Sequence, residues 1–231
     1  MKGTVSKMVN LVQNPELESK TPRLDYAPES TIILEGVSWL TFQTLLAEVG
    51  ERRSSRFTYN QGVLEIRMPL QAHEEPLGMI ESAIEALADE LDLEIKKLGA
   101  TSLKRADLKK FVEPDTCFYI QHEAAVRQKS AIDLAIDPPP DLAIESDYTN
   151  SSLPKFSLYA ALGVPELWLY QQQTLEIYLL VEGNYQKSET SLAFPILPVA
   201  EIPQLIEQSK VVGQRAAIRS FRERIKAIAL K

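Results

Sequence analysis

Two carboxylates stand at the ends of a short apolar run in PPPDLAIES, residues 138–146. If this run is a β-strand, alternation places Asp141 and Glu145 on the same face, about 13 Å apart at about 3.3 Å per residue. That distance is too long for both to bind one metal ion. Burying an unpaired charge is costly, so at least one of the two must be solvated, capped, paired or metal-bound. Glu145 therefore needs a partner from another strand.

Asp115 is the candidate partner of Glu145. It follows Pro114 and begins the strand-like segment DTCFYI, whereas Glu145 lies near the end of its own strand. If the two strands are antiparallel neighbours, the start of one lies beside the end of the other, and the carboxylates converge. They would repel each other unless a cation lay between them, and hard oxygen ligands favour Mg²⁺ or Mn²⁺. The simpler alternatives are that Asp115 shapes a turn and that Glu145 forms a structural ion pair.

Lys155 is the natural complement of this carboxylate pair. It lies ten residues after Glu145, in the helical segment LPKFSLYAALG, so the short connection keeps it near. An ammonium group close to a phosphate stabilises the negative charge that develops there during hydrolysis. A solvated helix lysine is the alternative. Asp141 follows three prolines, where a cap or turn role is sufficient.

The remaining elements must position these residues. Helical spacing or caps predict helices over 37–50, 73–93, 123–132, 153–163 and from 202 onward. Alternation and turn residues predict a hairpin over 56–69 and strands over 93–99, 115–120, 141–145, 165–170, 174–183 and 184–190. Several consecutive strands are joined by short turns. The pattern therefore predicts an α/β (α+β) fold with a mixed central sheet flanked by helices.

Composition limits the classes of protein. The chain has 231 residues, 45% hydrophobic and 25% charged, which is typical of a globular protein. It contains one cysteine and two histidines, so a disulfide or a Cys- and His-rich metal centre is excluded, and any metal site must depend on carboxylates. No apolar run is long enough to span a membrane, and no signal peptide is evident, so we expect a cytoplasmic protein that does not contact membranes.

Three parts can be distinguished along the chain. We expect a flexible arm over residues 1–30, a folded domain over 31–208 and a basic C-terminal helix over 209–231. The net charge is −7, yet Lys210 to Lys231 contains seven basic residues and one acidic residue. We interpret this tail as an amphipathic helix that packs through Ile218, Phe221 and Ile225, with nucleic-acid contact as the alternative.

The order of these segments carries a resemblance to a known family. EPD, PDLAIES, KFSLYAALGVPELWLY and TLEIYLLVEGNY, in this order, resemble the Uma-type putative restriction endonucleases, which are abundant in cyanobacteria and belong to the PD-(D/E)XK nuclease superfamily. The resemblance extends from about residue 35 to residue 208. It implies a restriction-endonuclease-like fold and a metal-dependent nuclease. By the same resemblance, Asp115 and Glu145 are metal ligands, Lys155 is the catalytic lysine and the Ser146 carbonyl is a further ligand.

The sequence departs from the superfamily pattern after Glu145. The superfamily lysine normally lies two residues after the glutamate, where this chain has Asp147, so Lys155 must reach the site from its helix. Family members commonly carry a histidine at the position of His73, which suggests a substrate contact, a helix-start role or a plain surface position. Glu74 and Glu81, on the same predicted helix, could add a ligand or form part of its solvated acidic face.

Two hypotheses follow from these observations. In the first, the protein is a Mg²⁺- or Mn²⁺-dependent endonuclease that acts on DNA, as a homodimer if both strands are cut. Phosphate contacts would come from four basic residues of SLKRADLKK: Lys104, Arg105, Lys109 and Lys110. In the second, motivated by the acidic body and the residues after Glu145, the protein keeps the fold as a nucleic-acid or protein binding module with weak or no cleavage.

Overall fold

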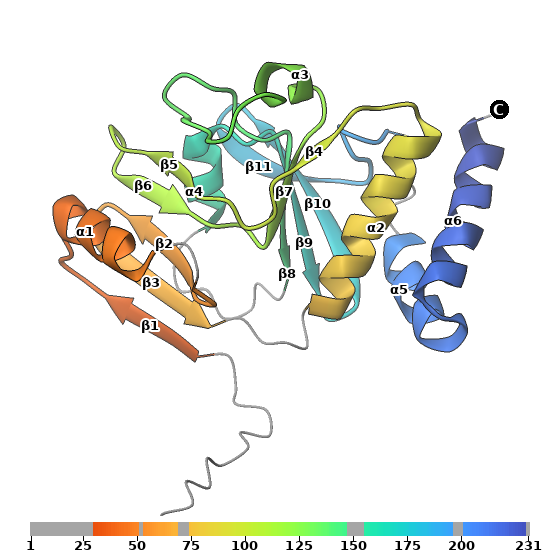
Figure 1. Ribbon diagram of the computed structural model, residues 1–231, viewed down its shortest axis with the longest axis horizontal. Coiled ribbons are helices and arrows are strands. Elements are labelled where there is room, and N and C mark those ends of the chain that lie inside the picture. The colour runs from red at the N-terminus through yellow and green to blue at the C-terminus, as the bar shows by residue number, and fades with distance from the viewer. Residues whose placement is uncertain (1–29, 51–52, 69–73, 147–154, 196–200, 230–231) are drawn as a thin grey trace, which may run out of the picture.

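The computed structural model describes residues 30–50, 53–68, 74–146, 155–195 and 201–229 (Figure 1). Six helices are present in this part of the chain: α1 (Trp39–Val49), α2 (Glu74–Glu90), α3 (Glu123–Val126), α4 (Lys155–Leu162), α5 (Glu201–Val212) and α6 (Gln214–Ala229). His73, predicted as a possible substrate contact, lies outside the described residues. So does most of the predicted N-terminal arm.

The strands of the described residues form two sheets. One is antiparallel, with the order β1-β3-β2-β6-β5, and the other has six strands in the order β11-β10-β9-β8-β7-β4. The strands of the first sheet are β1 (Ser30–Leu34), β2 (Arg56–Asn60), β3 (Val63–Met68), β5 (Leu103–Arg105) and β6 (Lys110–Val112). Those of the second are β4 (Lys96–Lys97), β7 (Thr116–Tyr119), β8 (Leu142–Ser146), β9 (Glu166–Gln171), β10 (Thr174–Val181) and β11 (Asn184–Ser188).

The six-stranded sheet is mixed and covered on both faces. Strands β8 and β9 are parallel and are joined through α4, whereas the other neighbours are antiparallel. Leu142 and Ile144 of β8 pack in a core with α2, α5 and α6, whereas Ala143 packs with Leu158 and Tyr159 of α4. Strand alternation thus sends the odd-numbered residues of β8 toward α4. The predicted mixed sheet flanked by helices is confirmed.

The antiparallel sheet has its own small core beneath α1 (Figure 1). The Phe42 ring of α1 packs against the rings of Tyr59 and Phe111, with centroid distances of 4.7 and 5.0 Å. Ser38 caps α1 by accepting a hydrogen bond from the Thr41 amide at 3.0 Å. Helix α4 also contacts β5 and β6, so it lies where the two sheets meet. A residue of α4 can therefore be close to both sheets.

The predicted β2–β3 hairpin is confirmed. Gln61 and Gly62 of its turn have φ angles of 48° and 108°, as expected for a two-residue turn that matches the twist of the strands. Other segments differ from the prediction. SLKRADLKK, for which no strand was predicted, contains β5 and ends at the first residue of β6, and these two strands pair with each other.

Two predicted elements are much shorter in the structure. Segment 93–99 contributes only the two residues of β4, and the helix expected over 123–132 is reduced to α3. After α3, the Asp133 side chain accepts a hydrogen bond from the Ala135 amide, and the Asp137 side chain accepts one from the Asp133 amide. Such local side-chain bonds offer the backbone an alternative to a helix.

The basic C-terminal segment forms α6. Its buried residues include the predicted Ile218, Phe221 and Ile225, which join the core shared with α2 and α5. Arg222 donates to the Glu90 carboxylate of α2 at 2.6 Å. The predicted packed amphipathic helix is thus present, although it begins at Gln214 and residue 208 lies inside α5. No helix in the described ranges is long and apolar enough to cross a membrane.

Candidate active site

Asp115 and Glu145 meet across neighbouring strands. Strands β7 and β8 are antiparallel with Thr116 opposite Ile144, so the register places Asp115, one residue before β7, opposite Glu145. Asp141 lies at the other end of this strand. Its carboxylate accepts hydrogen bonds from the amides of Ile120 and His122, at 2.6 and 2.9 Å, and contacts the His122 ring. Asp141 therefore serves as a backbone cap, and Glu145 has a different environment.

Glu145 is completely buried and bonded to two residues of α4. Lys155 Nζ lies 2.7 Å from Glu145 Oε2, and Tyr159 Oη donates to Glu145 Oε1 at 2.5 Å. Lys155 and Tyr159 are four residues apart, so they lie on the same face of the helix. Lys155 is only 2% exposed, which a solvated helix lysine would not be. Because the β8–α4–β9 crossover returns α4 over the face that carries Glu145, short connectivity brings these side chains together.

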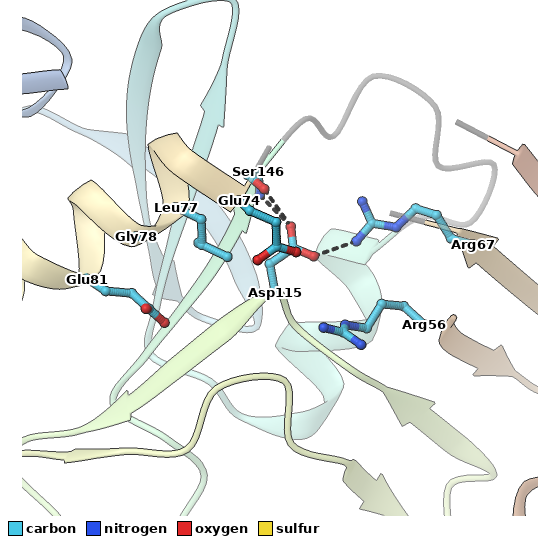
Figure 2. Close-up of a pocket in the computed structure, with 8 residues that line it drawn as sticks. All are labelled: Arg56, Arg67, Glu74, Leu77, Gly78, Glu81, Asp115 and Ser146. Atoms are coloured by element: carbon cyan, nitrogen blue, oxygen red, sulfur yellow. Dashed lines mark hydrogen bonds and ion pairs between the residues drawn. The ribbon is translucent and has the colours of Figure 1, made fainter. Parts of the chain in front are cut away.

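The Asp115 carboxylate has a different set of partners. Ser146 donates to Asp115 Oδ2 from its backbone amide, at 2.7 Å, and from its hydroxyl, at 3.0 Å. Arg67 Nη2 donates to Asp115 Oδ1 at 2.7 Å (Figure 2). Hydrogen bonds from two residues fix the plane of this carboxylate. The predicted Asp115, Glu145, Ser146 and Lys155 are thus all in one cluster.

Arg67 lies between the two carboxylates. In addition to its bond with Asp115, its Nη2 lies 3.6 Å from Glu145 Oε2. The side chain is 5% exposed, so its charge is largely removed from water. Two buried carboxylates are therefore matched by two buried cations, Arg67 and Lys155. The cation that two facing carboxylates require is, in this structure, a guanidinium group.

Arg67 and Tyr159 were not among the residues predicted for the site. Tyr159 is buried, and its hydroxyl contacts Glu145. Burial, followed by the charge of Glu145, holds the pKa of Tyr159 well above its ordinary value, so this hydroxyl stays protonated and can donate. Arg67 alternates with the apolar Leu64 and Ile66 along β3, and that alternation was the available signal that it points away from the α1 core.

A small polar pocket of about 180 Å³ opens beside the cluster (Figure 2). It is lined by Arg56, Arg67, Glu74, Leu77, Gly78, Glu81, Asp115 and Ser146. The pocket lies where the open end of the β2–β3 hairpin faces the first turns of α2 and the ends of β7 and β8. Solvent therefore reaches Asp115, whereas Glu145 lies behind it.

The cluster SLKRADLKK lies away from this pocket. Lys110 pairs with Asn60 at the turn end of β2, and Arg56 lies at the opposite end of that strand, about 13 Å away at about 3.3 Å per residue. Arg105 is bonded to Asp107, and Lys110 is bonded to Asn60. These residues are therefore not in position to contact a group bound at the carboxylates.

The residues at the cluster fit a hard divalent cation in their chemistry. Two carboxylates converge on one cationic group, and Mg²⁺ is commonly held in proteins by one or two carboxylates while it keeps several waters. No three His, Cys, Asp or Glu side chains in the described ranges lie close enough together to hold a metal ion. Protein side chains would thus supply two ligands, Asp115 and Glu145.

The fold and the cluster define a mixed α/β protein with a carboxylate and lysine site next to a polar pocket. Comparison with known proteins gives a family. Residues 39–208, most of the chain, match the Uma2 family, described as putative restriction endonucleases. The chain belongs to this family, which has a nuclease-like function.

One similar solved structure is that of a putative nuclease belonging to DUF820 from Anabaena variabilis ATCC 29413, which is 14% identical. The match covers 79% of this chain and 99% of the other, with a TM-score of 0.49. No curated protein matches the chain.

Proposed function

We propose that this protein is a metal-dependent endonuclease that hydrolyses phosphodiester bonds in DNA. The observation that carries the proposal is the convergence of Asp115, Glu145 and Lys155 beside a polar pocket, in a chain of the Uma2 family. Asp115, Glu145 and the Ser146 carbonyl would hold Mg²⁺ or Mn²⁺. When bound, the ion would supply an activated water and polarise the phosphodiester.

The protein residues have distinct roles in this proposal. Water attacks phosphorus and releases a proton to solvent, the bond to the leaving oxygen breaks, and that oxygen takes up a proton from solvent. Lys155 Nζ carries positive charge next to the carboxylates and offsets the negative charge that develops on the phosphate. Tyr159 is a positioning residue, because its hydroxyl orients the Glu145 carboxylate without reaching the pocket.

Arg67 favours a second candidate function. Its guanidinium lies between Asp115 and Glu145, and Lys155 is fully buried against Glu145, so both carboxylates are already neutralised. A protein in this state can bind a nucleic acid or protein partner without cleaving it. A catalytically weak binding module is therefore the alternative. Under either function the proposed site of action is the cytoplasm, and cleavage of both strands of a duplex favours a homodimer.

The test is cleavage of supercoiled plasmid DNA in Mg²⁺ or Mn²⁺, with EDTA as the metal-free control. Wild type is compared with Glu145→Ala, Lys155→Ala and the matched surface variant Lys187→Ala, whose lysine pairs with Glu176 at the same 2.7 Å but is 57% exposed. We expect nicking by wild type and Lys187→Ala, and loss of at least about a hundredfold in the two site variants. Thermal unfolding of each variant controls for loss of fold.

If wild type cleaves DNA and Glu145→Ala cleaves it at the same rate, the proposed site is wrong. Absence of cleavage by well-folded wild type in both metals, together with DNA binding, would favour the binding module. Sedimentation analysis of wild type with and without duplex DNA tests the dimer, and a monomer in both conditions contradicts it.

A further inference from the structure

Two arginines stand directly opposite each other at the open end of the β2–β3 hairpin. Arg56 of β2 is the register partner of Arg67 of β3. Like charges in directly opposite positions of an antiparallel pair destabilise a sheet. The charge of Arg67 is offset by Asp115 and Glu145. Arg56 makes no ion pair among the described residues, and its buried Nε has no hydrogen-bond partner there.

Both arginines line the polar pocket with Asp115 and Ser146. Figure 2 shows the Arg56 and Arg67 side chains extending from their strands toward Asp115, with Glu81 of α2 on the opposite side and Glu74 of α2 close to Asp115 in this view. The pocket therefore has a cationic side on the hairpin and an acidic side on the helix. An anion that enters the pocket is attracted by the arginines of the hairpin and repelled by the glutamates of the helix.

We infer that Arg56, together with Arg67, binds a backbone phosphate of DNA next to the carboxylate cluster. The inference rests on the proposed function and adds a phosphate-binding residue to it. A guanidinium presents parallel N–H groups that match two phosphate oxygens, and a phosphate bound in the pocket would offset the charge of the cross-strand arginine pair. It also replaces SLKRADLKK as the source of phosphate contacts near the site, because that segment lies at the turn end of the hairpin.

The experiment is DNA binding without cleavage. Fluorescence anisotropy of a labelled duplex oligonucleotide is measured in EDTA, at several salt concentrations, for wild type, Arg56→Gln and Arg127→Gln. Arg127 is the matched control, because it follows α3 and pairs with Glu123 outside the pocket. We expect Arg56→Gln to raise Kd roughly tenfold and to reduce the slope of log Kd against log salt by about one. Arg127→Gln should leave both quantities unchanged.

Two further readouts separate this role from a structural one. Without DNA, the Tm of Arg56→Gln should equal or exceed that of wild type, because the substitution removes a like-charge pair. A lower Tm would identify Arg56 as a structural residue and overturn the inference. Inorganic phosphate at constant ionic strength tests a free-anion site. Stabilisation of wild type but not of Arg56→Gln by phosphate, with equal DNA affinity in both, would assign the site to free phosphate and overturn the DNA assignment.

The outcomes for the inference and for the proposed function are distinct. If wild type cleaves plasmid while Arg56→Gln binds DNA with wild-type affinity and slope, the inference is wrong and the proposed nuclease function stands. If wild type neither binds nor cleaves DNA, the proposed function is wrong, and the phosphate assignment is overturned with it.

Discussion

Lys155 Nζ lies 2.7 Å from Glu145 Oε2, and both side chains are buried, at 2% and 0% exposure. The pair is reinforced by Tyr159 on the second Glu145 oxygen and by Arg67 at 3.6 Å. Burying two charges is costly even when they are paired, so this cluster does not maximise stability. The cluster lies at the edge of a polar pocket, and buried charges in such a position are typical of binding and catalytic sites.

Removing Lys155 alone should destabilise the fold strongly. Lys155→Met leaves Glu145 buried with less positive charge around it, and we expect the free energy of unfolding to fall by about 3 kcal/mol, the lower end of the usual range because Arg67 remains nearby. The double variant Lys155→Met/Glu145→Gln should recover much of this loss. Urea denaturation followed by circular dichroism measures both.

The surface pair of Lys187 and Glu176 provides the control for this prediction. Lys187→Met should cost less than about 1 kcal/mol, because an exposed ion pair contributes little. A Lys155→Met protein as stable as Lys187→Met would contradict the buried arrangement.

Tyr159→Phe should weaken the fold while it preserves the packing of the ring. The substitution removes the hydroxyl that donates to Glu145 Oε1 at 2.5 Å and leaves that buried oxygen without this partner. The expected loss is about 2 kcal/mol, within the range for a hydrogen bond to a charged group. Tyr185→Phe is the control. Its hydroxyl donates to the neutral Val164 carbonyl at 2.6 Å, so the expected loss is nearer 1 kcal/mol. Equal losses in the two variants would argue against a special role for the Glu145 contact.

Replacing Arg67 should strengthen metal binding. Its guanidinium occupies the position between Asp115 and Glu145, and a unit charge about 4 Å away is worth about 4 kcal/mol at an effective dielectric constant near 20. We expect Arg67→Gln to lower the Kd for Mn²⁺ at least about tenfold, as measured by titration calorimetry without DNA.

The same variant should be less stable without metal and recover on addition of Mn²⁺, because the ion would then compensate the two carboxylates. Arg105→Gln, outside the pocket, should bind Mn²⁺ as wild type does. Weaker Mn²⁺ binding by Arg67→Gln would mean that the guanidinium supports the ion instead of competing with it.

Glu166 should make stability depend on pH in the opposite sense to an ordinary ion-paired carboxylate. Burial raises its pKa above the usual 4.5, although Trp168 and the Ala193 amide donate to it. The folded state therefore binds more protons than the unfolded state between the unfolded and folded pKa values. In that window the contribution of Glu166 to stability increases as the pH falls.

The comparison of wild type with Glu166→Gln isolates this effect. The free energy of unfolding of wild type minus that of the variant should rise as the pH falls from 7 toward about 4.5, measured by urea denaturation. Other titrating groups contribute to both proteins and largely cancel. A difference that decreases on acidification would show that hydrogen bonds, and not burial, control this carboxyl.

Local sequence patterns were sufficient for most elements of the fold. The Ser38 cap, the Gln61–Gly62 turn and the helical repeat of α2 each depend on residues close together in the chain. Predictions failed where local competition or long-range pairing decides the outcome. The helix expected over 123–132 ends at Val126, ahead of a turn in which the Asp133 and Asp137 side chains accept backbone hydrogen bonds, and no strand was predicted in SLKRADLKK, where β5 pairs with β6.

The chain order by itself determined which residues of the β7–β8–α4 unit meet. Asp115 at a strand start, Glu145 near a strand end and Lys155 in the following helix converge because antiparallel neighbours and a short crossover permit few other arrangements. Only the tertiary structure showed that Arg56 and Arg67 lie beside the Asp115 and Glu145 carboxylates. They belong to a hairpin of the other sheet, and sequence alternation shows which face a side chain occupies but not which faces pack together.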